Sequence, residues 1–137
     1  MDKYDVSDCF YTSPQNGVML YHARNRQANA PVILKYIKVP GGQTELDILR
    51  KEGDNQIRLY NHPYVCKVYE FTSITDNSTY PPSLYMVLSL EQCTIDLDKL
   101  WTNKSRNSEF LQENYLWTLL YECVEALAYA QDLVTVM

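Results

Sequence analysis

No apolar run in this 137-residue sequence is long enough to span a bilayer, and no apolar signal core follows the first methionine. The sequence also lacks a surplus of basic charge, because its 12 Lys and Arg residues are outnumbered by 17 Asp and Glu residues. This balance disfavours a nucleic-acid backbone or an anionic membrane surface as the main partner. We therefore expect a cytoplasmic protein, with the nucleus as the alternative location.

Cysteine pairs and catalytic histidines are scarce as well. The four cysteines are scattered and form no Cys-x-x-Cys pair, so we expect reduced thiols and no metal site. The two histidines, His22 and His62, have no serine or cysteine nucleophile set beside them, which gives hydrolase chemistry no support. His62 stands in an Asn-His-Pro turn, where we expect it to have a structural role.

The length is that of one domain, and short apolar stretches alternate with turn residues through its first two thirds. The pattern predicts antiparallel strands near residues 4–12, 18–25 and 31–39, a helix over 44–60, and strands at 66–72 and 83–90. The turn-forming stretch SPQNG (Ser13 to Gly17) separates the first two strands, and PGGQ (Pro40 to Gln43) separates the third strand from the helix. The expected order is strand, strand, strand, helix, strand, strand.

Beyond residue 90 the chain becomes helical. A short helix is predicted at 95–101 and a long amphipathic helix over 108–133, with Asn107 or Ser108 as the cap of the long helix. Its apolar stripe consists of Leu116, Leu119, Leu120, Cys123, Val124 and Leu127. The preceding elements offer this stripe little cover, so we expect it to dock on another protein or to mediate self-association.

One lysine, Lys35, stands among bulky apolar residues in the expected third strand, within the stretch VILK. Leu20 precedes it by 15 residues (35 − 20 = 15). Three longer stretches follow in order: NHPYVCKVYEF, SLYMVLSL and FLQENYLWTLLYECVEALAYAQ. Together, in this order and spacing, these features resemble the N-terminal lobe of a protein kinase.

The resemblance implies an α+β fold. Residues 1–90 would form a kinase-like N-lobe, a five-stranded antiparallel sheet with one packed helix. Residues 91–137 would form the hinge and the first helices of an incomplete C-lobe, a short helix followed by the long amphipathic one. The activity of the family is ATP-dependent phosphorylation of protein hydroxyl groups.

The resemblance also implies roles for individual residues. Lys35 would contact the α- and β-phosphates of ATP and pair with a glutamate of the helix. Glu52 is the best candidate for that glutamate, although it lies 11 residues before Pro63 (63 − 52 = 11), where the family more often has ten. Glu45 is the fallback. The structural alternative is that Lys35 is an edge-strand lysine with a buried stem.

Other positions follow from the same resemblance. Leu88 would be the gatekeeper beside the adenine pocket. The backbone of the hinge, Ser89, Leu90 and Glu91, would bond the base. Asp96 could reach a ribose hydroxyl, or it could be the N-cap of the short helix.

Two departures from the family pattern predict that ATP binding is weak or lost. The glycine-rich loop should fall on Ser13, Gln15 and Val18, where only the nearby Gly17 can supply part of the turn. Ile33 shares a strand face with Lys35 and occupies the position where the family has a small alanine against the adenine. Its three extra carbons crowd the pocket at a cost of roughly 1–3 kcal/mol.

A third departure concerns catalysis. The family's catalytic-loop aspartate and magnesium-binding residues have no counterpart in this sequence, so we expect the chain to be inactive in phosphotransfer. One explanation is a fragment of a longer kinase, produced by a gene-model fault such as read-through of an intron at Val134. The other is a pseudokinase-like interaction module that docks a partner through its long helix.

Overall fold

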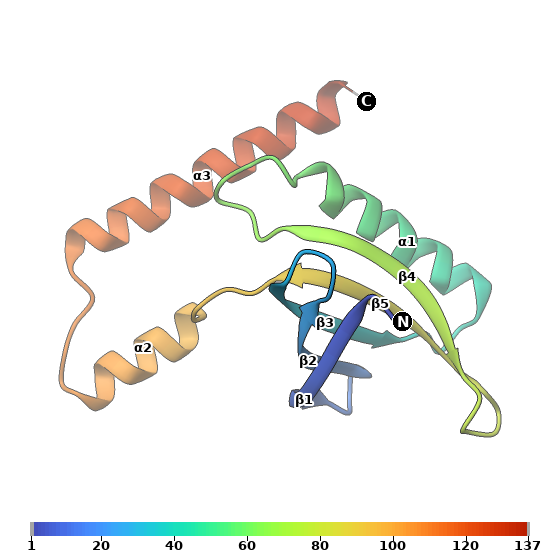
Figure 1. Ribbon diagram of the computed structural model, residues 1–137. Helices are drawn as coiled ribbons and strands as arrows, with labels where there is room; N and C mark the ends of the chain where they lie inside the picture. The colour runs from blue at the N-terminus through green and yellow to red at the C-terminus, as the bar shows by residue number, and fades with distance from the viewer. Residues whose placement is uncertain (1, 137) are drawn as a thin grey trace. The chain divides into compact units, whose positions relative to one another are not determined.

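The computed structural model describes residues 2–136 and contains one five-stranded antiparallel sheet and three helices, an α+β architecture (Figure 1). The strands are β1 (Tyr4–Ser13), β2 (Val18–Asn25), β3 (Ala30–Lys38), β4 (Val68–Asp76) and β5 (Ser83–Glu91). The helices are α1 (Gln43–Arg58), α2 (Leu97–Arg106) and α3 (Glu113–Val136). The predicted order of elements is confirmed. Within residues 2–136, none of the helices has the length and hydropathy needed to cross a membrane.

The chain forms two compact units. The first, here called the sheet unit, comprises the residues up to Tyr60 together with Cys66–Gln92. The second, the helical unit, comprises Asn61–Val65 and the chain from Cys93 onward. The sequence placed a boundary after residue 90. In the structure the boundary lies after Gln92, because β5 continues to Glu91. The Asn-His-Pro turn belongs to the helical unit.

The sheet has the strand order β1-β2-β3-β5-β4, and alternate residues of each strand point to opposite faces. One face, the helix face, carries α1 and the buried residues Val39, Leu46, Val68, Met86 and Leu88. The opposite face, the tyrosine face, buries Ala23, Val32, Leu34 and Val87 under Tyr4, Tyr21, Tyr36 and Tyr85. Both faces therefore bury apolar surface, which explains why β3 and β5 have few polar residues.

Helix α1 packs on the helix face against β4 and β5 (Figure 1). Leu46 and Gly53 are its buried residues. A Cβ atom added at Gly53 would lie 2.8 Å from the Phe71 ring. Glycine lowers helix propensity at this position, but it lets the helix approach β4 closely.

The join between α2 and α3 differs from the prediction that Asn107 or Ser108 caps the long helix. Both residues end α2 instead: Ser108 has a φ of 56°, and the Glu109 amide donates to the Lys104 carbonyl at 2.8 Å. This is the hydrogen-bond pattern of a C-terminal helix cap. The predicted cap was wrong, because α3 begins at Glu113, five residues after Ser108.

His62 packs inside the helical unit. Its Nδ1 accepts a hydrogen bond from the Tyr64 amide at 3.2 Å, and its ring centroid lies 4.9 Å from that of Tyr129 on α3. The imidazole is buried. These contacts agree with the expected structural role, because they tie the Asn-His-Pro turn to the long helix.

Candidate functional site

Lys35 lies in the middle of β3 on the helix face of the sheet. In the sheet register, Leu20 of β2 is its partner on one side and Leu88 of β5 on the other, and Leu88 in turn pairs with Phe71 of β4. The lysine is half-buried. These four residues form one row across four strands, here called the Lys35 row.

The next row on the same face contains Ile33. It pairs with His22 of β2 and Leu90 of β5, and Leu90 pairs with Val68 of β4. The prediction that Ile33 and Lys35 share a face is confirmed by this register. The register neighbours of Lys35 and Ile33 on this face are therefore mostly apolar.

Glu52 precedes the residue of α1 that contacts the Lys35 row. Its neighbour Gly53 sits over Phe71, the last member of that row. Arg50 hydrogen-bonds Ser73 of the edge strand β4 at 3.4 Å, and Glu52 is about 200° around the helix from Arg50. Glu52 is therefore on the flank nearer the inner strands.

The Glu52 side chain is exposed, and no ion pair between Glu52 and Lys35 occurs among residues 2–136. The fallback, Glu45, is engaged elsewhere. Its carboxylate accepts a hydrogen bond from the Gly41 amide at 2.8 Å, which holds it at the start of α1. Of the two glutamates, Glu52 is the better placed to reach Lys35.

The turn between β1 and β2 is tight. Ser13 and Val18, two of the expected glycine-loop positions, pair with each other as the last rung of the β1–β2 ladder. Gly17 has a φ of 61°, and its carbonyl accepts from the Lys38 amide at 2.9 Å. A Cβ atom there would lie 2.8 Å from the Lys38 Cβ. Gly17 thus anchors the turn to the end of β3.

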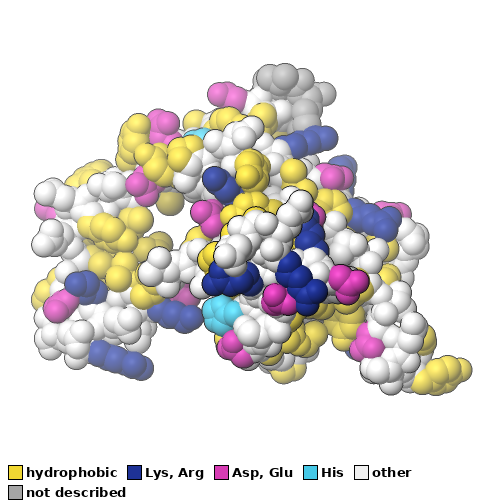
Figure 2. Space-filling model, in the orientation of Figure 1, with side chains coloured by type: hydrophobic (Ala, Val, Ile, Leu, Met, Phe, Trp, Pro, Cys, Tyr) yellow, Lys and Arg dark blue, Asp and Glu magenta, His cyan; other side chains and the backbone are white. Residues whose placement is uncertain are grey.

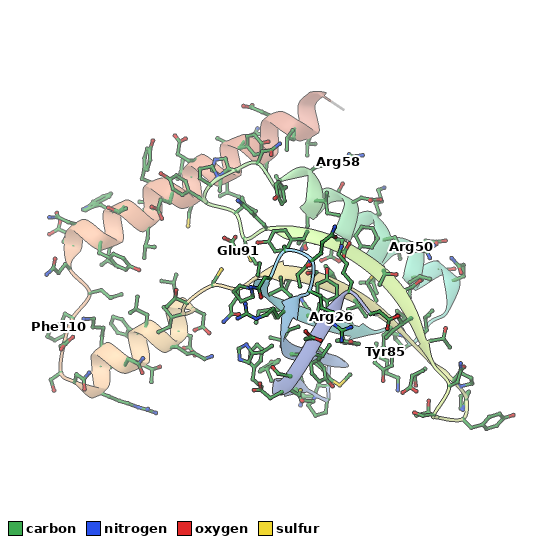
Figure 3. All side chains as sticks on the ribbon, in the orientation of Figure 1. Arg26, Arg50, Arg58, Tyr85, Glu91 and Phe110 are labelled. Carbon is green, nitrogen blue, oxygen red and sulfur yellow. The ribbon has the colours of Figure 1, made fainter. Side chains whose placement is uncertain are left out.

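The expected hinge residues are part of β5. Ser89, Leu90 and Glu91 pair with Leu34, Ile33 and Val32 of β3. The Glu91 amide donates to the Lys67 carbonyl at 2.8 Å, and its carboxylate accepts from the Lys67 amide at 3.2 Å. Figure 3 shows Glu91 at the end of the strand. The sheet therefore occupies backbone groups that the expected hinge would offer to a base.

Asp96, for which two roles were open, is the N-cap of α2. Its carboxylate accepts a hydrogen bond from the Lys99 amide at 2.7 Å. The four cysteines are all exposed and form no disulfide.

The residue pattern did not reveal a polar cluster on the tyrosine face. The Glu70 carboxylate of β4 accepts hydrogen bonds from the Tyr4 hydroxyl and, at 2.7 Å, from the Lys3 ammonium. The hydrogen bonds from Lys3 and then Tyr4 lower the pKa of Glu70, while burial and then the hydrogen bond to Glu70 raise the pKa of Tyr4. No local motif could have shown this cluster, because its members are 66 and 67 residues apart.

A scan of protein-family models finds no match to this chain, and a search of curated proteins finds no match either. The geometry of the two units therefore carries the functional argument.

Proposed function

We propose that the sheet unit is a kinase-like nucleotide-binding lobe in which Lys35 contacts the phosphates of ATP. The observation that carries the proposal is the Lys35 row. It sets the only lysine of the helix face of β3 between Leu20 and Leu88, in the row whose last member, Phe71, contacts the Gly53 that follows Glu52. A half-buried lysine beside an apolar surface and near a free carboxylate suits a ligand with an aromatic base and an anionic tail.

The apolar side of the site would hold the adenine ring. Leu20, Ile33 and Leu90 lie on the same face as Lys35, with Leu88 as the gatekeeper. Glu52 would orient the Lys35 ammonium by approaching it from α1. Gly17 would contribute to phosphate binding only through the turn that it stabilises, and Asp96 is engaged as a helix cap.

Binding should be weak for two physical reasons. Ile33 fills space that the base requires, and Ser13 and Val18 are locked in the strand ladder instead of forming an open phosphate cradle. We propose ATP binding and not phosphotransfer for these 137 residues, because they contain no His-Arg-Asp and no Asp-Phe-Gly sequence. Magnesium would be bound by the nucleotide phosphates, because the magnesium-binding residues of the family have no counterpart here.

The experiment is thermal unfolding at 10 mM Mg-ATP of the chain and of two lysine variants. Lys35→Met removes the proposed phosphate contact. Lys38→Met is the matched control, since Lys38 is exposed on the same strand but faces the other side. With a Kd of about 1 mM, binding stabilises the folded chain by about 1.4 kcal/mol.

We expect Mg-ATP to raise the melting temperature of the unmodified chain and of Lys38→Met by a few degrees, and that of Lys35→Met by less than a third as much. Equal shifts in the two variants, or no shift in any of the three proteins, would contradict the proposal.

A second candidate function is an interaction module that binds a partner helix through α3. Six positions at spacings of 4, 3, 4, 3 and 4 residues lie along one side of this helix: Leu116, Leu120, Cys123, Leu127, Ala130 and Val134. This is the spacing of a coiled-coil seam. Leu120 and Leu127 are 53% and 70% exposed, and Figure 2 shows hydrophobic side chains on the surface of the helical unit.

The charge of α3 indicates the kind of partner. The helix carries Glu113, Glu122, Glu125 and Asp132 but no lysine or arginine. A second copy would bring like charges together, whereas a basic amphipathic helix would complement them. Binding of such a helix to α3 tests this candidate.

A further inference from the structure

The loop that joins β4 to β5, here called the β4–β5 loop, consists of residues 77–82. It follows the last rung of the β4–β5 ladder, which pairs Asp76 with Ser83. Its sequence is Asn-Ser-Thr-Tyr-Pro-Pro, and all six residues are exposed. Figure 1 shows the loop projecting from one end of the sheet. A partner can therefore reach the loop without displacing a strand or a helix.

Hydrogen bonds within the hairpin hold the backbone of this loop. The Ser78 amide donates to the Asp76 carboxylate at 2.9 Å, and hydrogen bonds from the side chain and then the backbone of Ser78 lower the pKa of Asp76. The Thr79 hydroxyl donates to the Pro81 carbonyl at 3.1 Å and also lies 3.1 Å from the Ser83 hydroxyl. The two prolines of the loop restrict its backbone further. These contacts order the loop without using its tyrosine.

Tyr80 is the tyrosine of this loop, and its side chain is 101% exposed. It takes part in no hydrogen bond or ring contact with another residue of the range 2–136. The next most exposed tyrosine in this range is Tyr121, at 59%, and it lies within α3. Tyr60 and Tyr64 are outside helices and strands, but their rings pack on other aromatic rings. Tyr80 is therefore unlike the other tyrosines of the chain.

This accessibility matters for enzymes that modify a tyrosine hydroxyl. A tyrosine kinase must bring the hydroxyl within hydrogen-bond reach of its catalytic aspartate and in line with the γ-phosphate of ATP. A tyrosine in the middle of a helix or a sheet cannot enter such a site unless backbone hydrogen bonds break. Exposed loop tips are the places where enzymes reach a folded chain most readily. Tyr80 meets this requirement in the folded state.

The charge of the hairpin indicates what a phosphate on Tyr80 would do. A phosphate adds a charge of about −1.5 to −2. β4, β5 and the loop between them contain no lysine or arginine. The hairpin therefore offers the phosphate no cation of its own, and the group would stay available to the arginines of a binding partner.

We propose that Tyr80 is phosphorylated by a separate protein tyrosine kinase and that the phosphotyrosine is the ligand of an arginine-bearing partner. The Tyr80 hydroxyl oxygen forms the bond to the γ-phosphorus of ATP, and the bond from that phosphorus to the bridging oxygen of ADP breaks. The hydroxyl proton passes to the catalytic aspartate of the kinase. The site does not depend on nucleotide binding at Lys35, because the modifying enzyme binds its own ATP.

The first test compares the folded chain with two matched variants, Tyr80→Phe and Tyr121→Phe. Each is incubated with Mg-ATP and the purified catalytic domain of a tyrosine kinase, and peptide mass spectrometry locates the phosphate. We expect Tyr80 to carry most of the early phosphate, so that Tyr80→Phe lowers the initial rate about fivefold or more. Tyr121→Phe should leave the rate nearly unchanged. Equal rates for the chain and Tyr80→Phe, or faster labelling of another tyrosine, would overturn the proposal.

The second test asks whether the phosphate on Tyr80 is free. Its ³¹P resonance should titrate with a pKa of about 6, the ordinary value for a phosphotyrosine without a cationic partner. An SH2 domain, which binds phosphotyrosine through an arginine, should bind the phosphorylated chain at least tenfold more tightly than the unmodified chain. A phosphate pKa well below the ordinary value, or equal binding of both forms by the SH2 domain, would overturn the role of the phosphate as a ligand.

Discussion

At the scale of single residues, Gly53 couples a helix to the sheet. Its backbone lies so close to the Phe71 ring that a Cβ atom would approach to 2.8 Å. The glycine lowers the helix propensity of α1, but it allows the helix to approach β4 closely. At position 53, close packing against Phe71 therefore outweighs the low helix propensity of glycine.

A substitution of Gly53 measures that balance. Alanine should gain about 1 kcal/mol of helix propensity and lose about 1–3 kcal/mol through contact with Phe71. We expect Gly53→Ala to lower the free energy of unfolding by about 1 kcal/mol in urea titrations. The matched control is Asn55→Ala on the exposed side of the same helix, which should be neutral or slightly stabilising.

The double variant Gly53→Ala with Phe71→Leu tests whether the Phe71 ring causes the loss of stability in Gly53→Ala. A smaller side chain at position 71 should reduce the cost of the alanine if the ring is responsible. If Gly53→Ala stabilises the chain as much as Asn55→Ala does, the close approach of α1 to β4 is contradicted.

At the scale of elements, α3 has two unlike sides. Leu119, Ala126 and Tyr129 are less exposed, and Tyr129 packs on His62 within the helical unit. Leu116, Leu120 and Leu127 are exposed, as is Phe110 on the preceding loop (Figure 3). One side therefore packs within the helical unit, while the other carries exposed apolar side chains.

A prediction for α3 concerns peptide binding. A lysine-rich amphipathic helical peptide should bind the chain, and the same peptide with glutamate in place of each lysine should bind at least tenfold more weakly. Fluorescence anisotropy of labelled peptide measures both affinities. Leu120→Glu should abolish binding, whereas Asn114→Glu, the same added charge on an exposed residue off the leucine seam, should not.

Two results would contradict this prediction. One is equal affinity for the two peptides, since it would remove the role of charge. The other is a stable dimer in sedimentation experiments that Leu120→Glu disrupts, since it would make a second copy of the chain the occupant of the seam.

At the scale of the whole sheet unit, the Tyr4–Glu70–Lys3 cluster links the two edges of the sheet. β1 and β4 are the edge strands, yet side chains from the start of β1 reach Glu70 on β4 across the tyrosine face. The sheet must therefore be curled. A cavity lined by Leu34 and Ser89 opens on the tyrosine face, and α1 packs on the other face.

The cluster predicts a pH dependence of stability. The pKa of Glu70 is lowered in the folded chain, so the unfolded chain binds more protons in the acid range. The contribution of Glu70 is complete above the ordinary glutamate pKa of about 4.3 and is lost as the pH falls through the lower, folded-state pKa.

Urea unfolding of the chain and of Glu70→Gln between pH 7 and pH 3 measures this contribution. The unmodified chain should be the more stable of the two at pH 7, by at most about 1 kcal/mol because the Glu70 side chain is 42% exposed and its charge is screened. The difference should shrink toward pH 3. A difference that stays constant over this range would contradict the linkage.

The sequence alone determined the order of the elements, their approximate bounds and the face that Ile33 shares with Lys35, since the period-2 and helical patterns and the turn residues are local signals. It missed the end of α2, because a serine in the left-handed conformation has no distinctive sequence signal. It also predicted a hinge at Ser89, Leu90 and Glu91, which are part of strand β5.

Only the tertiary structure showed that Gly53 of α1 contacts Phe71 and that the Glu45 carboxylate accepts from the Gly41 amide. It also created the Tyr4–Glu70–Lys3 cluster and the cavity at Ser89. The physical reason is that these features join segments far apart in the chain, and their contacts depend on the pairing and curl of the whole sheet.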